Sequence, residues 1–302
     1  MTSGAVVGTS LGASMFFALS TALKHRSADK ASAGDPDKRT VHFLRDTAVS
    51  PLWLGGMLAD LGGLTLQITA LHIGALAVVQ PLMITALLFS LVLNHVVAGT
   101  RITRRELAGG VALVLSLAAF LFVSGASSPS ITGPAQAADP MPAVALGVVA
   151  VLVSLVCLAI ARRSSPGLRA ALIGATVGIA YACTAALIKA SSNVLVAHGP
   201  VALFTSWQLS VVVVSGAAGL VLTQLAFRAG PLRSSLPSIA TVDPLFSILL
   251  GVVVYDERLR TGALAVVGEV LCLVALCGSA AYLGRMTIDD TPASAEPPAV
   301  HT

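Results

Sequence analysis

Nine apolar stretches, each close to 20 residues long, dominate this sequence of 302 residues. A helix of about 20 apolar residues is long enough to cross the roughly 30 Å hydrocarbon core of a bilayer. Charged residues make up only 11% of the chain, against about 25% in an average soluble domain. The stretches run from Ser3 to Leu23, Pro51 to Leu71, Gly74 to Val97, Leu107 to Val123, Met141 to Ala161, Leu168 to Lys189, Val201 to Phe227, Leu232 to Tyr255 and Gly262 to Leu283.

This composition excludes a soluble enzyme, a nucleic-acid-binding protein and a disordered scaffold. The stretches lack the alternation of barrel strands, and a helix satisfies its own backbone polar groups in lipid. We therefore predict an all-α polytopic membrane protein with about nine transmembrane helices. Its surroundings are the lipid bilayer, and we expect no nucleic-acid partner.

The basic residues predict the orientation of the chain. If the N-terminus is outside, 15 of the 18 Lys and Arg residues face the cytoplasm, and only Lys189, Arg258 and Arg260 face outward. Cytoplasmic loops are enriched in Lys and Arg, so we predict a multi-pass plasma-membrane protein with its N-terminus outside and its C-terminus cytoplasmic. Because Lys24 and Arg26 follow the first stretch and no basic residue precedes it, we expect an uncleaved span there.

An internal repeat divides the chain into two halves with an offset of 156 residues. Coincident glycine and proline positions carry this repeat, because matches of Leu or Ala are common in so apolar a chain. They pair Gly63 with Gly219, Gly74 with Gly230, Pro81 with Pro237 and, with a slightly different offset, Gly8 and Gly12 with Gly174 and Gly178. Since five spans precede the second copy, it should be inverted in the membrane, as in many secondary transporters.

We therefore predict two inverted four-helix repeats joined by a central helix. Residues 1–125 form the first repeat, with a polar cytoplasmic loop at 24–50. Residues 126–166 form an external linker and the connecting fifth helix. The second repeat covers 167–286, and 287–302 form a disordered cytoplasmic tail.

Three acids lie inside predicted spans: Asp60, Asp243 and Glu269. A carboxylate at the centre of a membrane helix costs about 2.5–3.5 kcal/mol, and we expect no Lys or Arg at matching depth to neutralise these three. They should therefore face a wet cavity, be protonated, or hold a cation. Such an interior suits a cationic or protonatable substrate, an inference that would weaken if Lys189, Arg228 or Arg233 reached inward. The alternative is a protonated carboxyl that only bonds a neighbouring helix.

Uncharged polar residues and prolines surround these acids. Gln67, Gln80 and Gln224 are candidate substrate-binding residues, with helix capping or interhelical hydrogen bonding as the alternative. Prolines delete a backbone hydrogen bond, and breaks at matching places in two halves indicate a transport site. The candidate helix breaks are at Pro81, Pro237 and Pro244, and kinks that serve packing alone are the other interpretation.

Small residues recur every fourth position in the first and sixth spans, which favours close helix packing. Packing within the chain is the simpler interpretation, and a homodimer seam is the alternative. The two stripes are Gly4, Gly8 and Gly12, and Ala170, Gly174, Gly178, Ala182 and Ala186. All four cysteines also lie inside predicted spans, where we expect them to be small packing residues.

Motifs for other chemistry are absent from the sequence. There is no Gly-rich loop ending in Lys-Ser or Lys-Thr, no His-Glu-x-x-His and no Cys-x-x-Cys. We therefore expect neither an enzyme nor a cofactor.

Two segments resemble the drug/metabolite transporter superfamily, of the EamA-like kind. The first is Ala70 to Val123, which contains Ala-Leu-His-Ile-Gly-Ala-Leu-Ala-Val-Val-Gln-Pro-Leu. The second is Gln224 to Pro237, followed by a span that ends in Asp-Glu-Arg-Leu at residues 256–259. The nine spans and the Val-Val-Gln-Pro-Leu stretch look most like the NIPA-type magnesium transporter branch. Leu64, however, stands where that branch has an acid, and Arg228 stands near the end of the seventh span where an acid is common.

The resemblance implies a secondary transporter that moves a small solute by alternating access. With the three acids, it predicts a cationic or amine-bearing solute, with or without proton coupling. A NIPA-type permease for magnesium or another divalent cation is one alternative. A membrane scaffold or lipid-handling subunit with the same fold, which transports nothing, is the other.

Overall fold

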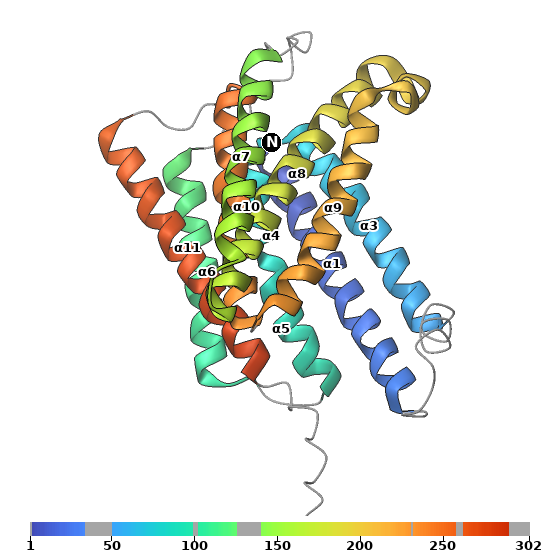
Figure 1. The fold of residues 1–302 in the computed structure, drawn as a ribbon, viewed down its shortest axis with the longest axis vertical. Coiled ribbons are helices and arrows are strands. Elements are labelled where there is room, and N and C mark those ends of the chain that lie inside the picture. Colours follow the sequence, from blue (N-terminus) through green and yellow to red (C-terminus); the bar gives the residue numbers. More distant parts are fainter. Residues whose placement is uncertain are drawn as a thin grey trace, which may run out of the picture.

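The computed structural model describes residues 2–33, 50–98, 102–125, 140–230, 232–257 and 262–289, and in these residues it contains helices and no β-strand (Figure 1). The helices are α1 (Thr2–Ala33), α3 (Pro51–Ile73), α4 (Leu76–Met83), α5 (Thr85–Ala98), α6 (Arg104–Ser124), α7 (Pro140–Ala161), α8 (Pro166–Thr205), α9 (Trp207–Ala229), α10 (Leu232–Val254) and α11 (Ala263–Asp289).

Nine segments of the described chain are long and apolar enough to cross a membrane. This confirms the predicted class, an all-α multi-pass membrane protein. The linker predicted at 126–139, the tail beyond Asp289 and most of the cytoplasmic loop lie outside the described residues. The first candidate span ends at Lys24, where that loop was predicted to begin, and α1 continues beyond the span as a helix to Ala33.

The helices pack in two groups. Helix α1 lies along α3 and α5, and α8 lies along α9 and α10, with α7 against α8. Helix α6 packs on α11 at the side of the molecule away from α1 and α3 (Figure 1). The short helix α4 lies between the groups, where it contacts both α1 and α10.

Local sequence explains where several helices begin. Ser50 caps α3 by accepting a hydrogen bond from the Trp53 N–H (3.1 Å), and Pro51 follows at the first helical position. Thr103 and Glu106 form a capping box at the start of α6, with each side chain accepting from the other's backbone N–H.

The third apolar stretch forms one candidate span, Leu76–Leu93, as predicted, but a one-residue break divides it into two consecutive helices. Helix α4 ends at Met83 and α5 begins at Thr85, so the break falls at Ile84, three residues after Pro81. The Ile84 N–H bonds the Pro81 carbonyl, which tightens the last turn of α4. Every residue from Leu76 to Leu82 is buried.

Helix α8 is longer than expected. The sixth stretch was placed at Leu168 to Lys189, but α8 runs on to Thr205 and α9 begins only at Trp207. Gly199 lies inside α8 with φ +79°, a conformation that glycine adopts without strain, and Pro200 follows it. These two residues bend the helix, so the end of α8 takes up residues that the sequence had suggested for the start of the seventh span.

Burial separates an inner core from an apolar outer surface. The core is built around α4 and includes Leu76, Val79 and Leu82 with Leu113 and Phe120 of α6. Large apolar side chains of α7, by contrast, are mostly exposed. An extensive exposed apolar surface is what a membrane-embedded chain presents to lipid.

The small-residue stripe of α8 is an internal packing seam. Its five members are buried, and α8 contacts α10 along it. A Cβ on Gly174 would lie 2.7 Å from the Ser235 carbonyl oxygen, and one on Gly178 would lie 2.9 Å from the Asp243 backbone nitrogen. Around Gly4 and Gly8 of the other stripe, a Cβ would meet nothing within 4 Å.

Candidate functional site

Asp60 has a basic partner, contrary to the expectation that no Lys or Arg would neutralise the intramembrane acids. Lys24, at the C-terminal end of the first predicted span, forms an ion pair with the Asp60 carboxylate on α3. Both side chains are only partly buried, at 32% and 40% exposure. The prediction was wrong because Lys24 is long enough to reach back along α3, toward which α1 packs closely.

Asp243 and Glu269 lie deeper, on α10 and α11, which contact each other. Asp243 is half-buried opposite Gly178 of α8, and it accepts a hydrogen bond from the Ser247 hydroxyl (3.3 Å). Glu269 is buried, at 6% exposure. Among the described residues no three His, Cys, Asp or Glu side chains gather closely enough to hold a metal ion, so Asp60 does not join the other two acids.

The three candidate glutamines have different surroundings. Gln80 lies in the buried helix α4, and its amide Nε2 has no hydrogen-bond partner within the described chain. Gln67 is half-buried on α3, and Gln224 is exposed on α9. Buried polar atoms are rarely left without a partner, so Gln80 is the glutamine best placed to bind a ligand.

The candidate helix breaks also differ between the two halves. Pro81 lies just before the break between α4 and α5, whereas α10 continues through both Pro237 and Pro244. Each proline removes one backbone hydrogen bond, but α10 packs closely on α8 along the glycine seam, and this packing holds the helix together.

A carboxylate from the turn after α10 caps the start of α4. Glu257 accepts hydrogen bonds from the backbone N–H groups of Leu76 (2.6 Å, at Oε1) and Ala77 (2.9 Å, at Oε2). The first N–H groups of a helix lack partners within it and carry its positive dipole, so a carboxylate is well suited there. This contact joins the two halves across 181 residues of sequence.

Lys189 of α8 neutralises the same carboxylate. Its Nζ donates to Glu257 Oε1 (2.6 Å) and to the Gly74 carbonyl oxygen (2.8 Å), and it lies 5.1 Å from the centre of the Tyr255 ring. Glu257 is 3% exposed and Lys189 is 9% exposed, so both charges are shielded from solvent. We name Lys189, Tyr255, Glu257 and the Gly74–Ala77 backbone the α4 clamp.

Two further contacts support the α4 clamp. The Tyr255 hydroxyl donates to the Ala186 carbonyl (2.5 Å), and burial raises the pKa of this hydroxyl, so it remains a donor. Nearby, His72 at the end of α3 bonds Asn193 of α8 through Nδ1 and Oδ1 (3.3 Å).

The backbone after α10 positions Glu257. The N–H groups of Tyr255 and Glu257 both bond the Gly251 carbonyl, and Asp256 between them has φ +49°. A Cβ on Gly251 would collide with the Glu257 carboxylate, so glycine makes room for the acid.

Both charged residues of this site were noted in the sequence, but their spacing could not show that they form a pair. Glu257 belongs to the Asp-Glu-Arg-Leu turn that carries part of the family resemblance. Lys189 was identified as a basic residue at the outward end of a span that could also reach inward, but no partner was assigned to it. Their partnership depends on tertiary packing that brings residues 68 positions apart into contact. Lys189 reaches inward, so the interior of the protein is less anionic than the sequence suggested.

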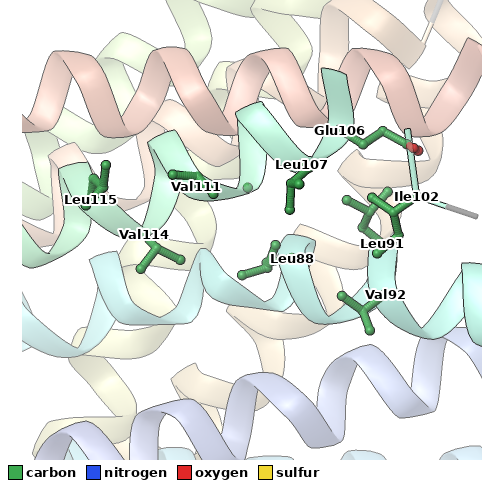
Figure 2. A pocket seen from close by; sticks show the side chains of 10 residues that line it. Leu88, Leu91, Val92, Ile102, Glu106, Leu107, Val111, Val114 and Leu115 are labelled. Carbon is green, nitrogen blue, oxygen red and sulfur yellow. The ribbon is translucent and has the colours of Figure 1, made fainter. Parts of the chain in front are cut away.

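A separate pocket of about 280 Å³ lies between α5 and α6 (Figure 2). Its walls are apolar apart from Glu106 at one end. The lining residues are Leu88, Leu91, Val92, Ile102, Glu106, Leu107, Gly110, Val111, Val114 and Leu115.

Helices and contacts together define a multi-pass helical membrane protein whose halves meet at a buried ion pair. The chain is 27% identical over 252 residues to an uncharacterized protein of Corynebacterium glutamicum, covering 83% of this chain and 84% of that relative. No protein-family model and no solved structure matches the chain. The similarity therefore covers most of both proteins, and because the relative is uncharacterized it indicates no activity for this chain.

Proposed function

We propose that this chain is a secondary transporter of the drug/metabolite transporter type, which moves a small cationic or amine-bearing solute by alternating access. The observation that carries the proposal is the α4 clamp, which closes one end of the molecule over a short, buried and interrupted helix between the two halves. Interrupted helices at the junction of two repeats are where secondary transporters bind their substrates.

Packing supports the inverted repeat on which this mechanism depends. In the proposed correspondence, α1, α3, α4–α5 and α6 match α8, α9, α10 and α11. Helix α1 packs on α3 as α8 packs on α9, and the matching pairs α4–α10 and α6–α11 contact each other. Contacts between equivalent helices are expected about a two-fold axis. The match is incomplete, because α3 contacts α8 but α1 and α9 share no contact among the described residues.

We place the proposed solute site along α10, which contacts α4 on one side and α11 on another, while α4 and α11 do not contact each other in the described chain. Asp243 and Glu269 supply negative charge there, and the Gln80 amide supplies a polar group without a protein partner. A cationic solute would offset the cost of a buried carboxylate, which is large in a membrane interior. Asp60 is left out of this site, because Lys24 neutralises it.

Two ion pairs give the proposed transport cycle its ends. Lys24 and Lys189 lie at the ends of the first and sixth predicted spans, which correspond in the proposed repeat, and each pairs with an acid. In an inverted repeat these pairs lie at opposite membrane faces. The clamp at Lys189 is buried and therefore closed, and its opening would admit solute from the outer face in the predicted orientation.

Flux into proteoliposomes tests the proposal. A ligand-induced thermal shift across metals, amines and metabolites first selects the solute, because a ligand stabilises the state that binds it. Asp243→Asn and Glu269→Gln should then each lower flux at least tenfold and reduce the thermal shift, whereas Asp60→Asn, the matched control outside the solute site, should keep the parent's thermal shift with the solute. Flux that survives both central substitutions would refute the site.

The alternatives give different outcomes in the same assay. A divalent-cation permease would show flux of magnesium and of no amine. A scaffold would show no flux of any solute and would copurify with a stable partner.

A further inference from the structure

The groove between α5 and α6 is open on the outer surface of the helix bundle. Helix α5 packs mainly on α1, and α6 packs mainly on α11, so the two helices touch each other only slightly. The side chains between them are apolar and many are exposed, including Leu107 (59%), Leu115 (63%) and Val92 (40%). In a membrane-spanning chain this surface faces hydrocarbon.

The length of the groove fits one leaflet of the bilayer. From Leu107 to Leu115 it follows α6 for about 12 Å, at 1.5 Å per residue. Half of a roughly 30 Å hydrocarbon core is about 15 Å. Figure 2 shows Leu115 and Val114 at one end of the groove and Ile102 and Glu106 at the other. The groove can therefore hold an acyl chain that begins at the Ile102 end.

The Ile102 end carries net positive charge. Arg104 and Arg105 are both exposed at the N-terminus of α6, where the helix dipole is also positive. The nearby acid, Glu106, is buried and already engaged. Its Oε1 lies 2.9 Å from His95 Nε2, and its Oε2 accepts the Thr103 N–H at 2.6 Å. Glu106 therefore does not turn its charge toward the two arginines.

We propose that the α5–α6 groove is a binding site for an anionic phospholipid, with one acyl chain between the helices and the phosphate group on Arg104 and Arg105. Apolar grooves that end in basic residues at the membrane surface recognise such lipids by combining both contacts. The site is separate from the proposed solute site and stands whether or not the chain transports anything.

A tryptophan reporter in the groove tests this binding. Leu115→Trp is made in the full chain with Trp53 and Trp207 replaced by Phe, and its fluorescence is quenched by lipids brominated on the acyl chain. The protein is reconstituted in phosphatidylcholine vesicles, into which brominated phosphatidylglycerol or brominated phosphatidylcholine is added. We expect quenching to favour phosphatidylglycerol, by roughly fivefold for each arginine that contacts the headgroup.

The chain offers a closely matched control. Leu152 on α7 is 56% exposed and lies 10 and 11 residues from Arg162 and Arg163, which are both exposed. Leu115 lies at the same two separations along the sequence, 10 residues from Arg105 and 11 from Arg104. Leu152→Trp therefore has an arginine pair at equal spacing, and we expect it to show no preference between the two lipids.

Two double variants decide between the outcomes. Arg104→Gln with Arg105→Gln should abolish the preference at Leu115→Trp, and Arg162→Gln with Arg163→Gln should leave it unchanged. Equal quenching by both lipids at Leu115→Trp, or an equal phosphatidylglycerol preference at Leu152→Trp, would overturn the proposal. Circular dichroism and gel filtration confirm that each exposed-site variant is folded.

Discussion

Removing the charge of Glu257 should destabilise the protein strongly. In Glu257→Gln the amide retains one oxygen for the Leu76 or Ala77 N–H, but Lys189 keeps a positive charge that is only 9% exposed. Breaking a buried ion pair on one side costs about 3–5 kcal/mol, because the remaining charge has no partner. At about 2–4 °C per kcal/mol, the midpoint of thermal unfolding should fall by roughly 10 °C.

Thiol reactivity provides the assay. All four cysteines lie in membrane-spanning helices as free thiols and are buried or half-buried. A maleimide dye that becomes fluorescent on reaction therefore reports unfolding of the detergent-solubilised protein as it is heated. The same measurement is made on Lys189→Met and on the double variant.

The double variant separates a specific pair from general damage. Lys189→Met with Glu257→Gln removes both charges, so it should recover about 2 kcal/mol relative to the sum of the single effects. As a comparison, Lys24→Met and Asp60→Asn should each cost less than about 1 kcal/mol, because that pair is partly exposed. The proposed coupling between Lys189 and Glu257 would be refuted if each single variant lost little free energy of unfolding, or if the loss in the double variant equalled the sum of the two single losses.

Three further outcomes follow from the structure. Gly178→Ala should destabilise by about 1–3 kcal/mol in the same thiol assay, since its Cβ would lie 2.9 Å from Asp243 N, whereas Gly147→Ala, with open space around it, should not. Burial raises the pKa of Tyr255, so above about pH 10 the folded state keeps a proton that the unfolded state loses, and the midpoint of thermal unfolding should fall as the pH rises. Tyr255→Phe should reduce this fall. A pH profile in the variant equal to that of the parent protein would contradict the reasoning. A green fluorescent protein fused to the C-terminus should fluoresce in cells if that end is cytoplasmic, and a dark but fully expressed fusion would reverse the predicted orientation.

The membrane class and the approximate spans could be predicted from the sequence because length and hydropathy dictate them. The ends of helices were less predictable. Gly199 has non-helical dihedrals, so α8 consists of two helical segments on either side of a kink. The break at Ile84 follows Pro81, while α10 continues through its own prolines. A proline removes the same hydrogen bond everywhere, and packing against neighbours decides whether the helix survives.

The candidate site was only partly predictable, since burial can be anticipated for single residues and partnership cannot. Asp243, Glu269 and Gln80 were singled out because polar groups are costly in lipid. Lys189 and Glu257 were missed as a pair because each stands at the end of a span, where exposure to headgroups is the ordinary outcome. Only the packing of α8 against the turn after α10 brings them together.

The capping of α4 by Glu257 constrains the order in which the protein can be assembled. When the ribosome has delivered the first half to the membrane, the acid that accepts the Leu76 and Ala77 N–H groups lies 181 and 180 residues away from them and has yet to be synthesised. Helix α4 can enter the membrane together with α5 as one span, Leu76–Leu93, but until Glu257 is made its first N–H groups lack the carboxylate that caps them. Helix α4 must therefore reach its final packed position after the last helices have been inserted. Halves expressed as separate chains should be degraded singly and accumulate only when produced together.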